Sequence, residues 1–406
     1  MKTNWQTKKL GEACDFLNGL WKGKEPPYIN VGVIRNTNIS KDGKLNDSDI
    51  AYLDVEKKQF VKRKLVYGDI ILEKSGGGPK QPVGRVIIFD KKDGDYSFSN
   101  FTSVIRIKKT NQIDFNYLHM YLFYSYISGI TEAMQSHSTG IRNLDSKLYK
   151  NIDVPIPPLP EQRRIVKNLD EVFGGIEKAR ENAEKNLKNA KELFESYLQN
   201  VFEKPGKDWK KKRLVEVCVF VRGPFGGSLK KNIFKAQGFA VYEQQHAIYN
   251  QFTNIRYFID KEKFQEMKRF ELFPGDLIMS CSGTMGKIAI APNEIKKGII
   301  NQALLKLTVK KELLSNFLKY WIESNSFQES LKKYSQGAAI QNVVAVKILK
   351  QIEFSFPNMN EQKAIVEKLD ALSSETKKLE GIYEQKLADL EELKKSILKK
   401  AFSGEL

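Results

Sequence analysis

Two long stretches of this chain repeat apolar residues at spacings of four and three, a pattern that predicts two long helices. The first stretch opens at Glu161 and continues to the stop signal Pro205-Gly206, and the second opens at Glu361. A helix of about 40 residues is about 60 Å long. Neither helix buries its stripe alone, so we expect the two to pair. The expected pairing residues are Ile165, Leu169, Val172, Ile176 and Leu193 in the first helix, and Ile365, Leu369, Leu372, Leu379, Leu390, Leu393 and Ile397 in the second.

The segment before each long helix mixes short β-rich runs with turns and ends in a helical pattern. The expected strands are 69–72, 84–89 and 103–107 in the first segment and 276–279, 287–290 and 303–307 in the second, with helices at 115–128 and 313–334. Each segment is therefore predicted to form a small α/β globule around a strongly bent sheet.

Each of the two patterns occurs twice because the chain contains an internal sequence repeat. One set of matches pairs Trp5, Lys8, Leu10, Glu12, Cys14, Phe16 and Gly19 with Trp209, Lys212, Leu214, Glu216, Cys218, Phe220 and Gly223. A second set pairs Pro157, Glu161, Gln162, Ile165, Val166, Leu169 and Asp170 with Pro357, Glu361, Gln362, Ile365, Val366, Leu369 and Asp370. The copies agree in these framework positions and differ between them, which favours two similar scaffolds that recognise two different things.

A chain that alternates globule, helix, globule and helix closes most simply as an antiparallel coiled coil with a globule at each end. The expected fold class is α+β, with two small α/β globules that alternate with two long helices, paired as an antiparallel coiled coil, and an internal pseudo-two-fold repeat. The expected domains are a first globule at 1–155, a first proline-led helix at 156–206, a second globule at 207–355 and a second helix at 356–406.

Charge adds information about partners. The chain has 406 residues and a formal net charge of +18. Such an excess favours a polyanion such as nucleic acid, although a lysine-rich proteome is an alternative explanation. The three cysteines form no CxxC pair, and Cys14 and Cys218 are expected in the core. Without an apolar leader or an 18-residue apolar run, a soluble cytoplasmic protein is expected.

The sequence shows no catalytic constellation. Neither a P-loop nor a G-x-G-x-x-G follows a strand, and His119, His137 and His246 lack ligand spacing, so no metal or cofactor site is expected. Asp69, Glu73 and Lys74 resemble a nuclease cluster, but the second copy retains only the aspartate. The chain is therefore expected not to be an enzyme.

What remains is a set of basic, polar and aromatic residues on the Gly-rich connections, which are side chains that suit base edges and phosphates. As a set on a strongly basic chain they favour contact with DNA. The candidates are Trp21, Lys22, Lys24, Lys74, Ser75, Lys80, Gln81, Arg85, Arg142, Arg222, Lys230, Lys231, Gln244, Gln245, His246, Ser282, Thr284, Lys287 and Gln341. Four asparagines at matched places are assigned to framework hydrogen bonds first: Asn100 with Asn301, and Asn143 with Asn342.

At this point the motifs resemble a known family. The stretches IDVPIPPLPEQRRIVKNLD (152–170), IEFSFPNMNEQKAIVEKLD (352–370) and SILKKAFSGEL (396–406) look like the specificity subunit of type I restriction–modification enzymes. Residues 275–287 with Asn301-Gln302 also resemble that family's target-recognition domains. The resemblance covers essentially the whole chain. The second connector departs from the pattern, because Asn358, Met359 and Asn360 replace Pro158, Leu159 and Pro160.

The resemblance implies that each globule reads one half of a bipartite DNA target. It also implies that the helices set the unread spacer and dock two methyltransferase subunits. S-adenosylmethionine would then sit on the methyltransferase subunits, and ATP and Mg on separate motor–nuclease subunits, with no cofactor in this chain. Because the globules differ in sequence, the two half-sites are expected to differ, which makes the target asymmetric.

Three alternatives remain at this stage. A coiled-coil adaptor would bind DNA weakly and without sequence preference. A nuclease would use Asp69 and Glu73. A recognition subunit of a methylation-based defence system without classical restriction would have the same sequence features, because any nuclease would be another chain.

Overall fold

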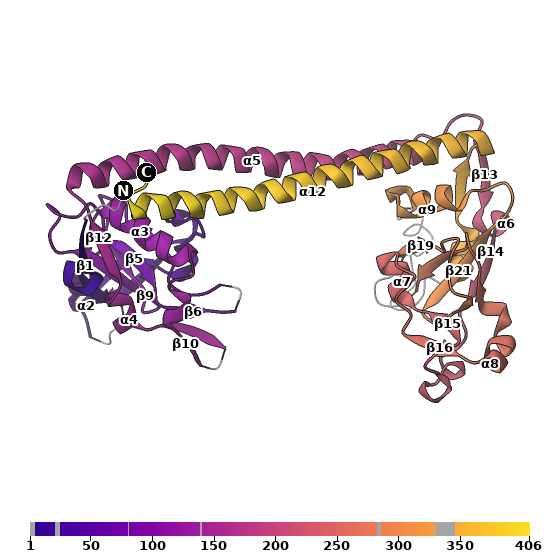
Figure 1. Ribbon diagram of the computed structural model, residues 1–406, viewed down its shortest axis with the longest axis horizontal. Helices are drawn as coiled ribbons and strands as arrows, with labels where there is room; N and C mark the ends of the chain where they lie inside the picture. The colour runs from indigo at the N-terminus through magenta and orange to yellow at the C-terminus, as the bar shows by residue number, and fades with distance from the viewer. Residues whose placement is uncertain are drawn as a thin grey trace. The chain divides into compact units, whose positions relative to one another are not determined.

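The computed structural model describes residues 5–20, 25–79, 81–138, 140–281, 286–327, 329 and 346–406, without the side chains of residues 137 and 138. Its contacts divide the chain into two compact units. The first unit comprises residues 1–184 and 385–406, and the second comprises residues 185–384. Each unit therefore contains one globule together with parts of both long helices (Figure 1). These helices are α5 (Leu159–Glu203) and α12 (Met359–Ser403), each of 45 residues.

The first globule is built on a four-stranded antiparallel sheet with the order β2-β9-β5-β7 and a three-stranded sheet with the order β4-β3-β8. A third sheet, β10-β11-β6, extends from the first, and β1 pairs with β12 beside the long helix. The elements are β1 (Gln6–Lys9), α1 (Leu10–Ala13), β2 (Cys14–Asn18), β3 (Tyr28–Ile34), β4 (Ala51–Glu56), α2 (Lys57–Arg63), β5 (Ile70–Glu73), β6 (Ser75–Gly77), β7 (Val86–Ile88), β8 (Tyr96–Phe98), β9 (Thr102–Ile107), α3 (Phe115–Ile127), β10 (Gln135–Ser138), β11 (Ile141–Leu144), α4 (Ser146–Lys150) and β12 (Asp153–Ile156).

The second globule repeats this framework. Its main sheet has the order β14-β21-β18-β19, its second sheet the order β16-β15-β20-β17, and β13 pairs with β22. The elements are β13 (Lys210–Arg213), α6 (Leu214–Val217), β14 (Cys218–Arg222), β15 (Phe239–Tyr242), α7 (Gln244–Tyr249), β16 (Tyr257–Ile259), α8 (Lys261–Glu266), β17 (Glu271–Leu272), β18 (Leu277–Ser280), β19 (Ile288–Ile290), β20 (Gly298–Ile300), β21 (Leu304–Val309), α9 (Ser315–Glu323), α11 (Val346–Gln351) and β22 (Glu353–Phe356).

The predicted α+β class is confirmed, and each of the six predicted strands overlaps an observed one. The predicted helix 313–334 is interrupted at Ser324, because α9 ends at Glu323 and residues 325–327 and 329 are helical again. The next residue, Ser324, adopts an extended conformation and its hydroxyl donates to the carbonyl of Trp321, which ends the helix. Part of the remaining prediction, at 328 and 330–334, lies outside the described residues.

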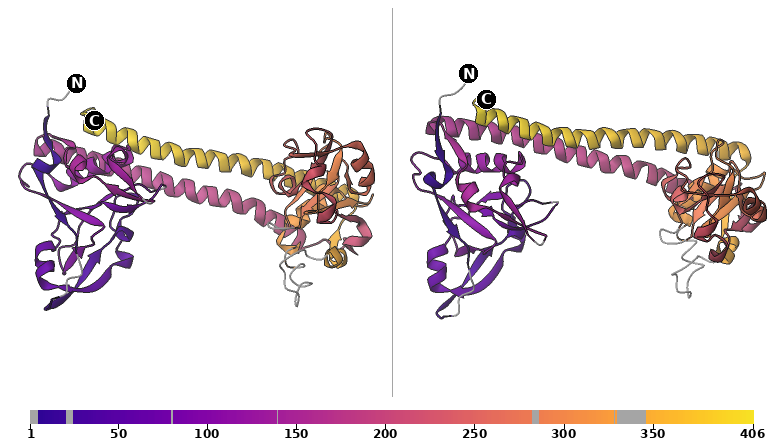
Figure 2. Two further views of the ribbon diagram at one scale, coloured as in Figure 1. Left: turned by 90° about the horizontal axis from the view of Figure 1, so that it is seen from below. Right: turned by 60° about the horizontal axis from the view of Figure 1, so that its bottom comes forward.

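Each globule is held by the start of one long helix and the end of the other. In the first unit, Ile165 and Leu169 of α5 and Leu398 and Phe402 of α12 belong to one core cluster. The second unit has the corresponding cluster, with Leu198 and Phe202 of α5 beside Val366 and Leu369 of α12. Within each unit the two helix segments run antiparallel and side by side (Figures 1 and 2). The long helices are therefore part of the cores of the globules.

The pairing surface of the helices differs by one residue from the predicted one at three places. Leu193, Leu379 and Leu393 are 52%, 38% and 45% exposed. The adjacent residues Phe194, Glu380 and Lys394 are half-buried instead. The reason is visible at Lys394, whose ammonium lies 5.2 Å from the ring centre of Phe173 in α5. A long polar side chain covers apolar surface with its stem, so a pattern of apolar letters misses it.

A buried glutamine joins each long helix to its globule. The Gln162 side chain accepts from the Asp114 amide (2.8 Å) and donates to the carbonyls of Gln112 (2.9 Å) and Pro157 (2.7 Å). Asp114 is the residue that caps α3. The three bonds therefore fix the proline-rich connector, the long helix and the start of α3 to one another.

The second unit repeats this joint with the same spacing. Gln362 accepts from the amide of Leu314, which precedes α9, at 2.9 Å. It also donates to the carbonyls of Glu312 and Pro357, both at 2.9 Å. Both glutamine residues are fully buried. The Glu-Gln pair that occurs twice in the sequence thus has a structural role in its second residue.

The joint gives a stability prediction. Replacing Gln362 with methionine keeps the volume of the side chain and leaves one amide and two carbonyls unpaired in the core. We expect a loss of about 3–5 kcal/mol in the free energy of unfolding of the second unit. Urea unfolding followed by tryptophan fluorescence measures it. The matched control Gln265→Met, on the exposed face of α8, should change stability by less than about 0.5 kcal/mol. Equal effects of the two substitutions would show that the hydrogen bonds of Gln362 do not stabilise the second unit.

Candidate nucleic-acid interface

Among the described residues predicted to contact DNA in the first globule, Lys74, Ser75 and Arg85 lie at one end of its main sheet. The strands β2 and β5 finish at Asn18 and Glu73, and β9 and β7 begin at the same edge. Lys74 follows β5 directly, and its ammonium donates to the Asn18 side chain at 3.0 Å. Burial lowers the pKa of Lys74. The side chain of Ser75, on β6, is bonded to Asn143 of β11, next to Arg142.

The second globule presents the same end of the same sheet. The strand β14 finishes at Arg222 and β18 at Ser280, where β21 and β19 begin. The Arg222 guanidinium donates to the carbonyl of Leu304 (3.1 Å), and the Lys287 side chain is exposed just before β19. The framework therefore brings Lys74 and Arg85 together in one copy and Arg222 and Lys287 in the other.

Arg85 and Lys287 occupy equivalent backbone positions with opposite surroundings. The amide of Glu73 donates to the carbonyl of Arg85 (2.9 Å), as the amide of Ser280 does to that of Lys287 (2.8 Å). The Arg85 side chain is buried in a two-bond ion pair with Glu73, with distances of 2.7 and 2.8 Å. Lys287 faces a serine and is exposed. Arg85 therefore stabilises its own globule and is poorly placed to touch DNA.

The other predicted residues of the second globule vary in exposure. Lys230 and Lys231 are exposed in the connection between β14 and β15, and Gln244 and Gln245 are half-buried in the first turn of α7. His246 is fully buried, and its Nδ1 accepts from the amide of Glu243 at 2.9 Å. It lies in the core and, like Arg85, is poorly placed for base contact.

In the first globule Gln81 is half-buried beside the guanidinium of Arg85, and Arg142 is half-buried 4.0 Å from the carboxylate of Glu132. The predicted residues that lie outside the described part of the chain are Trp21, Lys22, Lys24, Lys80, Ser282, Thr284 and Gln341.

Among the described asparagines, Asn143 and Asn301 make framework hydrogen bonds, as predicted. Asn143 is bonded to Ser75, and the Asn301 side chain accepts from the amide of Ala303 at 3.0 Å. The pairing of Asn100 with Asn301 is off by one residue. The amides of Ser99 and Asn301 make the equivalent bond to the end of the neighbouring parallel strand, at 2.9 Å in each globule. Asn342 lies outside the described residues.

A tight backbone crossing fixes this end of both sheets. A Cβ atom added to Gly19 would lie 1.8 Å from the carbonyl oxygen of Ser99, and one added to Gly223 would lie 1.8 Å from that of Asn301. Only glycine fits at such a distance. Two residues after Gly223, the Phe225 ring is 93% exposed. Phe225 is not among the residues predicted from the sequence, although its spacing from the repeated glycine equals that of Trp21.

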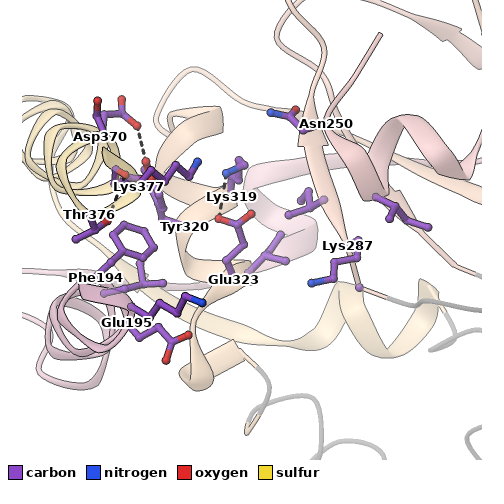
Figure 3. Close-up of a pocket in the computed structure, with 18 of the residues that line it drawn as sticks. Phe194, Glu195, Asn250, Lys287, Lys319, Tyr320, Glu323, Asp370, Thr376 and Lys377 are labelled. Atoms are coloured by element: carbon purple, nitrogen blue, oxygen red, sulfur yellow. Dashed lines mark hydrogen bonds and ion pairs between the residues drawn. The ribbon is translucent and has the colours of Figure 1, made fainter. Parts of the chain in front are cut away.

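Lys287 also lines a groove of about 970 Å³ in the second unit, between α5, α12, α9 and α7 (Figure 3). Within it the Tyr320 hydroxyl donates to Asp370 and joins α9 to α12, and burial raises the pKa of Tyr320. Lys319 is paired with Glu323 at 3.0 Å. Lys287 points toward this groove from the globule side. The groove therefore joins the end of the main sheet to the surfaces of α5 and α12.

The carboxylates of the nuclease alternative are engaged in the framework. Asp69 accepts from the Arg106 guanidinium at 2.8 and 2.7 Å, and this bond raises the pKa of Arg106. Glu73 is paired with Arg85, and both carboxylate side chains are 1% exposed. Among the described residues no group of three or more His, Cys, Asp or Glu side chains is arranged to hold a metal ion. The ion pairs account for Asp69 and Glu73 without a catalytic role.

The three cysteines are free and buried, as expected for Cys14 and Cys218. Burial raises the pKa of both these thiols to about 12. In the described part of the chain no helix is both long and apolar enough to span a membrane.

The contrast between Arg85 and Lys287 can be measured. Arg85→Met leaves the Glu73 carboxylate buried without its partner, so we expect the free energy of unfolding to fall by about 3–5 kcal/mol. Lys287→Met, at the equivalent position, should change stability by less than about 0.5 kcal/mol. Thermal and urea unfolding of the two variants gives the comparison. Combining Arg85→Met with Glu73→Leu should recover most of the loss, and no recovery would argue against the ion pair as the cause.

Comparison with known proteins gives one family. The model of the type I restriction modification DNA specificity domain matches residues 2–185 and 206–389. The MjaVIII specificity subunit of Methanocaldococcus jannaschii is 24% identical, with 99% of this chain and 93% of that protein covered. The EcoKI specificity subunit of Escherichia coli K12 is also 24% identical, over 99% of this chain and 89% of its own length.

Solved structures share the fold. A chain from a study of complex assembly and conformational transition of the type I R-M system aligns with a TM-score of 0.78 and 21% identity, covering 99% of this chain and 98% of that one. The HsdS subunit from Thermoanaerobacter tengcongensis aligns with a TM-score of 0.63 and 21% identity, over 99% and 97%. The family match spans both copies of the repeat, and the chain therefore belongs to the type I restriction–modification specificity subunits.

Proposed function

We propose that each globule of this chain reads one half of an asymmetric, bipartite DNA target for a type I restriction–modification complex. The observation that carries the proposal is the repeated sheet edge. The strand ends at this edge correspond in the two globules, as do the crossings at Gly19 and Gly223. Its side chains differ, with Lys74 in one copy and Cys281 in the other after equivalent strands. A shared frame with different side chains suits two different base sequences.

The long helices supply the second part of the proposal. Residues of each helix belong to the cores of both globules. A change in helix length would therefore change the separation of the two sheet edges. We assign to the pair the setting of the unread spacer and the docking of two methyltransferase subunits on the exposed helix faces. Arg163, 71% exposed on its side chain, and Lys188, 74% exposed, lie on such faces.

The chemistry then belongs to other chains. S-adenosylmethionine would act on the methyltransferase subunits, and ATP with Mg on the motor–nuclease subunits. This chain would contribute recognition and no catalytic group. Type I complexes act on double-stranded DNA, for which the net charge of +18 is favourable.

The deciding experiment maps adenine methylation in cells that express this chain with its methyltransferase subunit, against cells that lack this chain. We expect a gapped, non-palindromic motif that depends on this chain. A palindromic motif would refute the asymmetry. Methylation that persists without this chain, or DNA binding that is weak and indifferent to sequence, would favour the adaptor.

Two chimaeras separate the roles of globules and helices. Exchanging residues 1–155 for those of another family member should change one half-site and leave the other. Inserting seven residues into each helix preserves the spacing of four and three and adds about 10 Å, or about three base pairs. The same mapping should then show a longer spacer between unchanged half-sites. Altered half-sites after the insertion would contradict this division.

A further inference from the structure

A pocket lies at the corresponding place in each globule, beside the end of the main sheet that carries Lys74 or Arg222. In the first globule β3 runs parallel to β8, and Ile34 lies opposite Phe98. In the second β15 runs parallel to β20, and Tyr242 lies opposite Ile300. The residues that directly follow β3 and β15, Arg35 and Glu243, therefore occupy the same place in the fold.

Arg35 and Glu243 each line their pocket. The first pocket, of about 560 Å³, includes Val33, Ser99 and Asn100 besides Arg35. The second, of about 180 Å³, includes the counterparts of these residues, Val241, Asn301 and Gln302, besides Glu243. Both pockets lie at the backbone crossing of Gly19 or Gly223 with Ser99 or Asn301. They are thus adjacent to the edge that carries Lys74 and Arg222.

Each of these two side chains has a buried polar atom without a hydrogen-bond partner. The atoms are Nε of Arg35 and Oε2 of Glu243, each with less than 1 Å² of accessible surface. A second nitrogen of Arg35 is held by the carboxylate of Asp49 at 3.0 Å, which orients the guanidinium. Burial raises the pKa of Glu243, and the charge of Arg256 opposes this rise. A buried polar group without a partner is unfavourable. Neither side chain has its full set of hydrogen bonds within the chain, and the Arg35 side chain as a whole is 37% exposed.

The two groups offer opposite hydrogen bonding. A guanidinium only donates, and a carboxylate only accepts. In the major groove, arginine pairs with the O6 and N7 acceptors of guanine, while glutamate accepts from an exocyclic amino group such as N4 of cytosine. At equivalent positions, one pocket therefore has a hydrogen-bond donor and the other has an acceptor.

We propose that Arg35 and Glu243 are matched specificity-determining residues. Arg35 reads a guanine in the half-site of the first globule, and Glu243 reads the N4 amino group of a cytosine in the half-site of the second. This inference rests on the proposed function, because it assigns base chemistry to half-sites that the proposed function introduces.

The test uses the full complex with its methyltransferase subunits and two substitutions. Glu243→Gln keeps the shape and adds a donor, so it should relax one position of the second half-site toward adenine, which glutamine binds at N6 and N7. Arg35→Met should remove the guanine preference at one position of the first half-site. In each case we expect discrimination to fall about tenfold or more at that position, with the other half-site unchanged. Methylation mapping and competition between duplexes measure both effects.

Controls keep the result interpretable. Glu262→Gln, on exposed α8, should leave the motif unchanged. Glu243→Asp retains the acceptor and should keep the same base with weaker binding. If either main variant loses all methylation, thermal unfolding and binding of duplexes that carry one half-site decide the matter. Selective loss at one half-site supports the inference, and joint loss of both half-sites overturns it.

The two proposals can fail separately. A wild-type complex without any gapped motif would refute the proposed function. A gapped motif that stays the same in Glu243→Gln and in Arg35→Met would refute the inference and leave the proposed function standing. A motif whose first half-site lacks guanine would have the same consequence for Arg35.

Discussion

The hydrogen bonds of Gln162 and Gln362 are the constraint on which the arrangement of each unit depends. Each amide ties the connector, the long helix and the first residues of a globular helix into one buried joint. A globule that could rotate about its connector would not hold the edge of its main sheet at a defined angle to the helix. Because the joint is buried and all three bonds are made, rotation would leave several polar groups unpaired. This explains why the glutamine is present in both copies although the connectors differ.

Around this joint the two globules keep their backbone and change their interior chemistry. The first uses Glu73 with Arg85 where the second has Ser280 and an exposed Lys287. Asp69 pairs with Arg106, and its counterpart Asp276 lies 3.3 Å from the Lys306 ammonium. A buried charge needs a partner of opposite sign, and each globule supplies one to its buried aspartate, Arg106 in the first and Lys306 in the second. The sheet edge can then carry new side chains without loss of the fold.

The helix pair shows the same separation of geometry from residue identity. The residues of its pairing surface recur at spacings of four and three, yet they include Glu380 and Lys394 as well as leucine and alanine. Ala183 and Ala190 are nearly fully buried, and Leu193 nearby is exposed. Position on the helix thus decides burial more than hydrophobicity does, because the partner helix covers one face only.

The sequence by itself determined the repeat, the α+β class, the two long helices and the strands of the main sheets, because these depend on local periodicity and on matches within the chain. It also singled out Lys74, Arg222 and Lys287, which lie at or next to the ends of main-sheet strands. Only the tertiary structure decided that Arg85 and His246 are buried and that the pairing surface lies one residue from Leu193, Leu379 and Leu393. The tertiary structure alone showed that Arg35 and Glu243 hold equivalent positions in the two globules. Burial and equivalence of this kind depend on which strands pair across distant parts of the chain, and residue identity gives no signal when a positive side chain replaces a negative one.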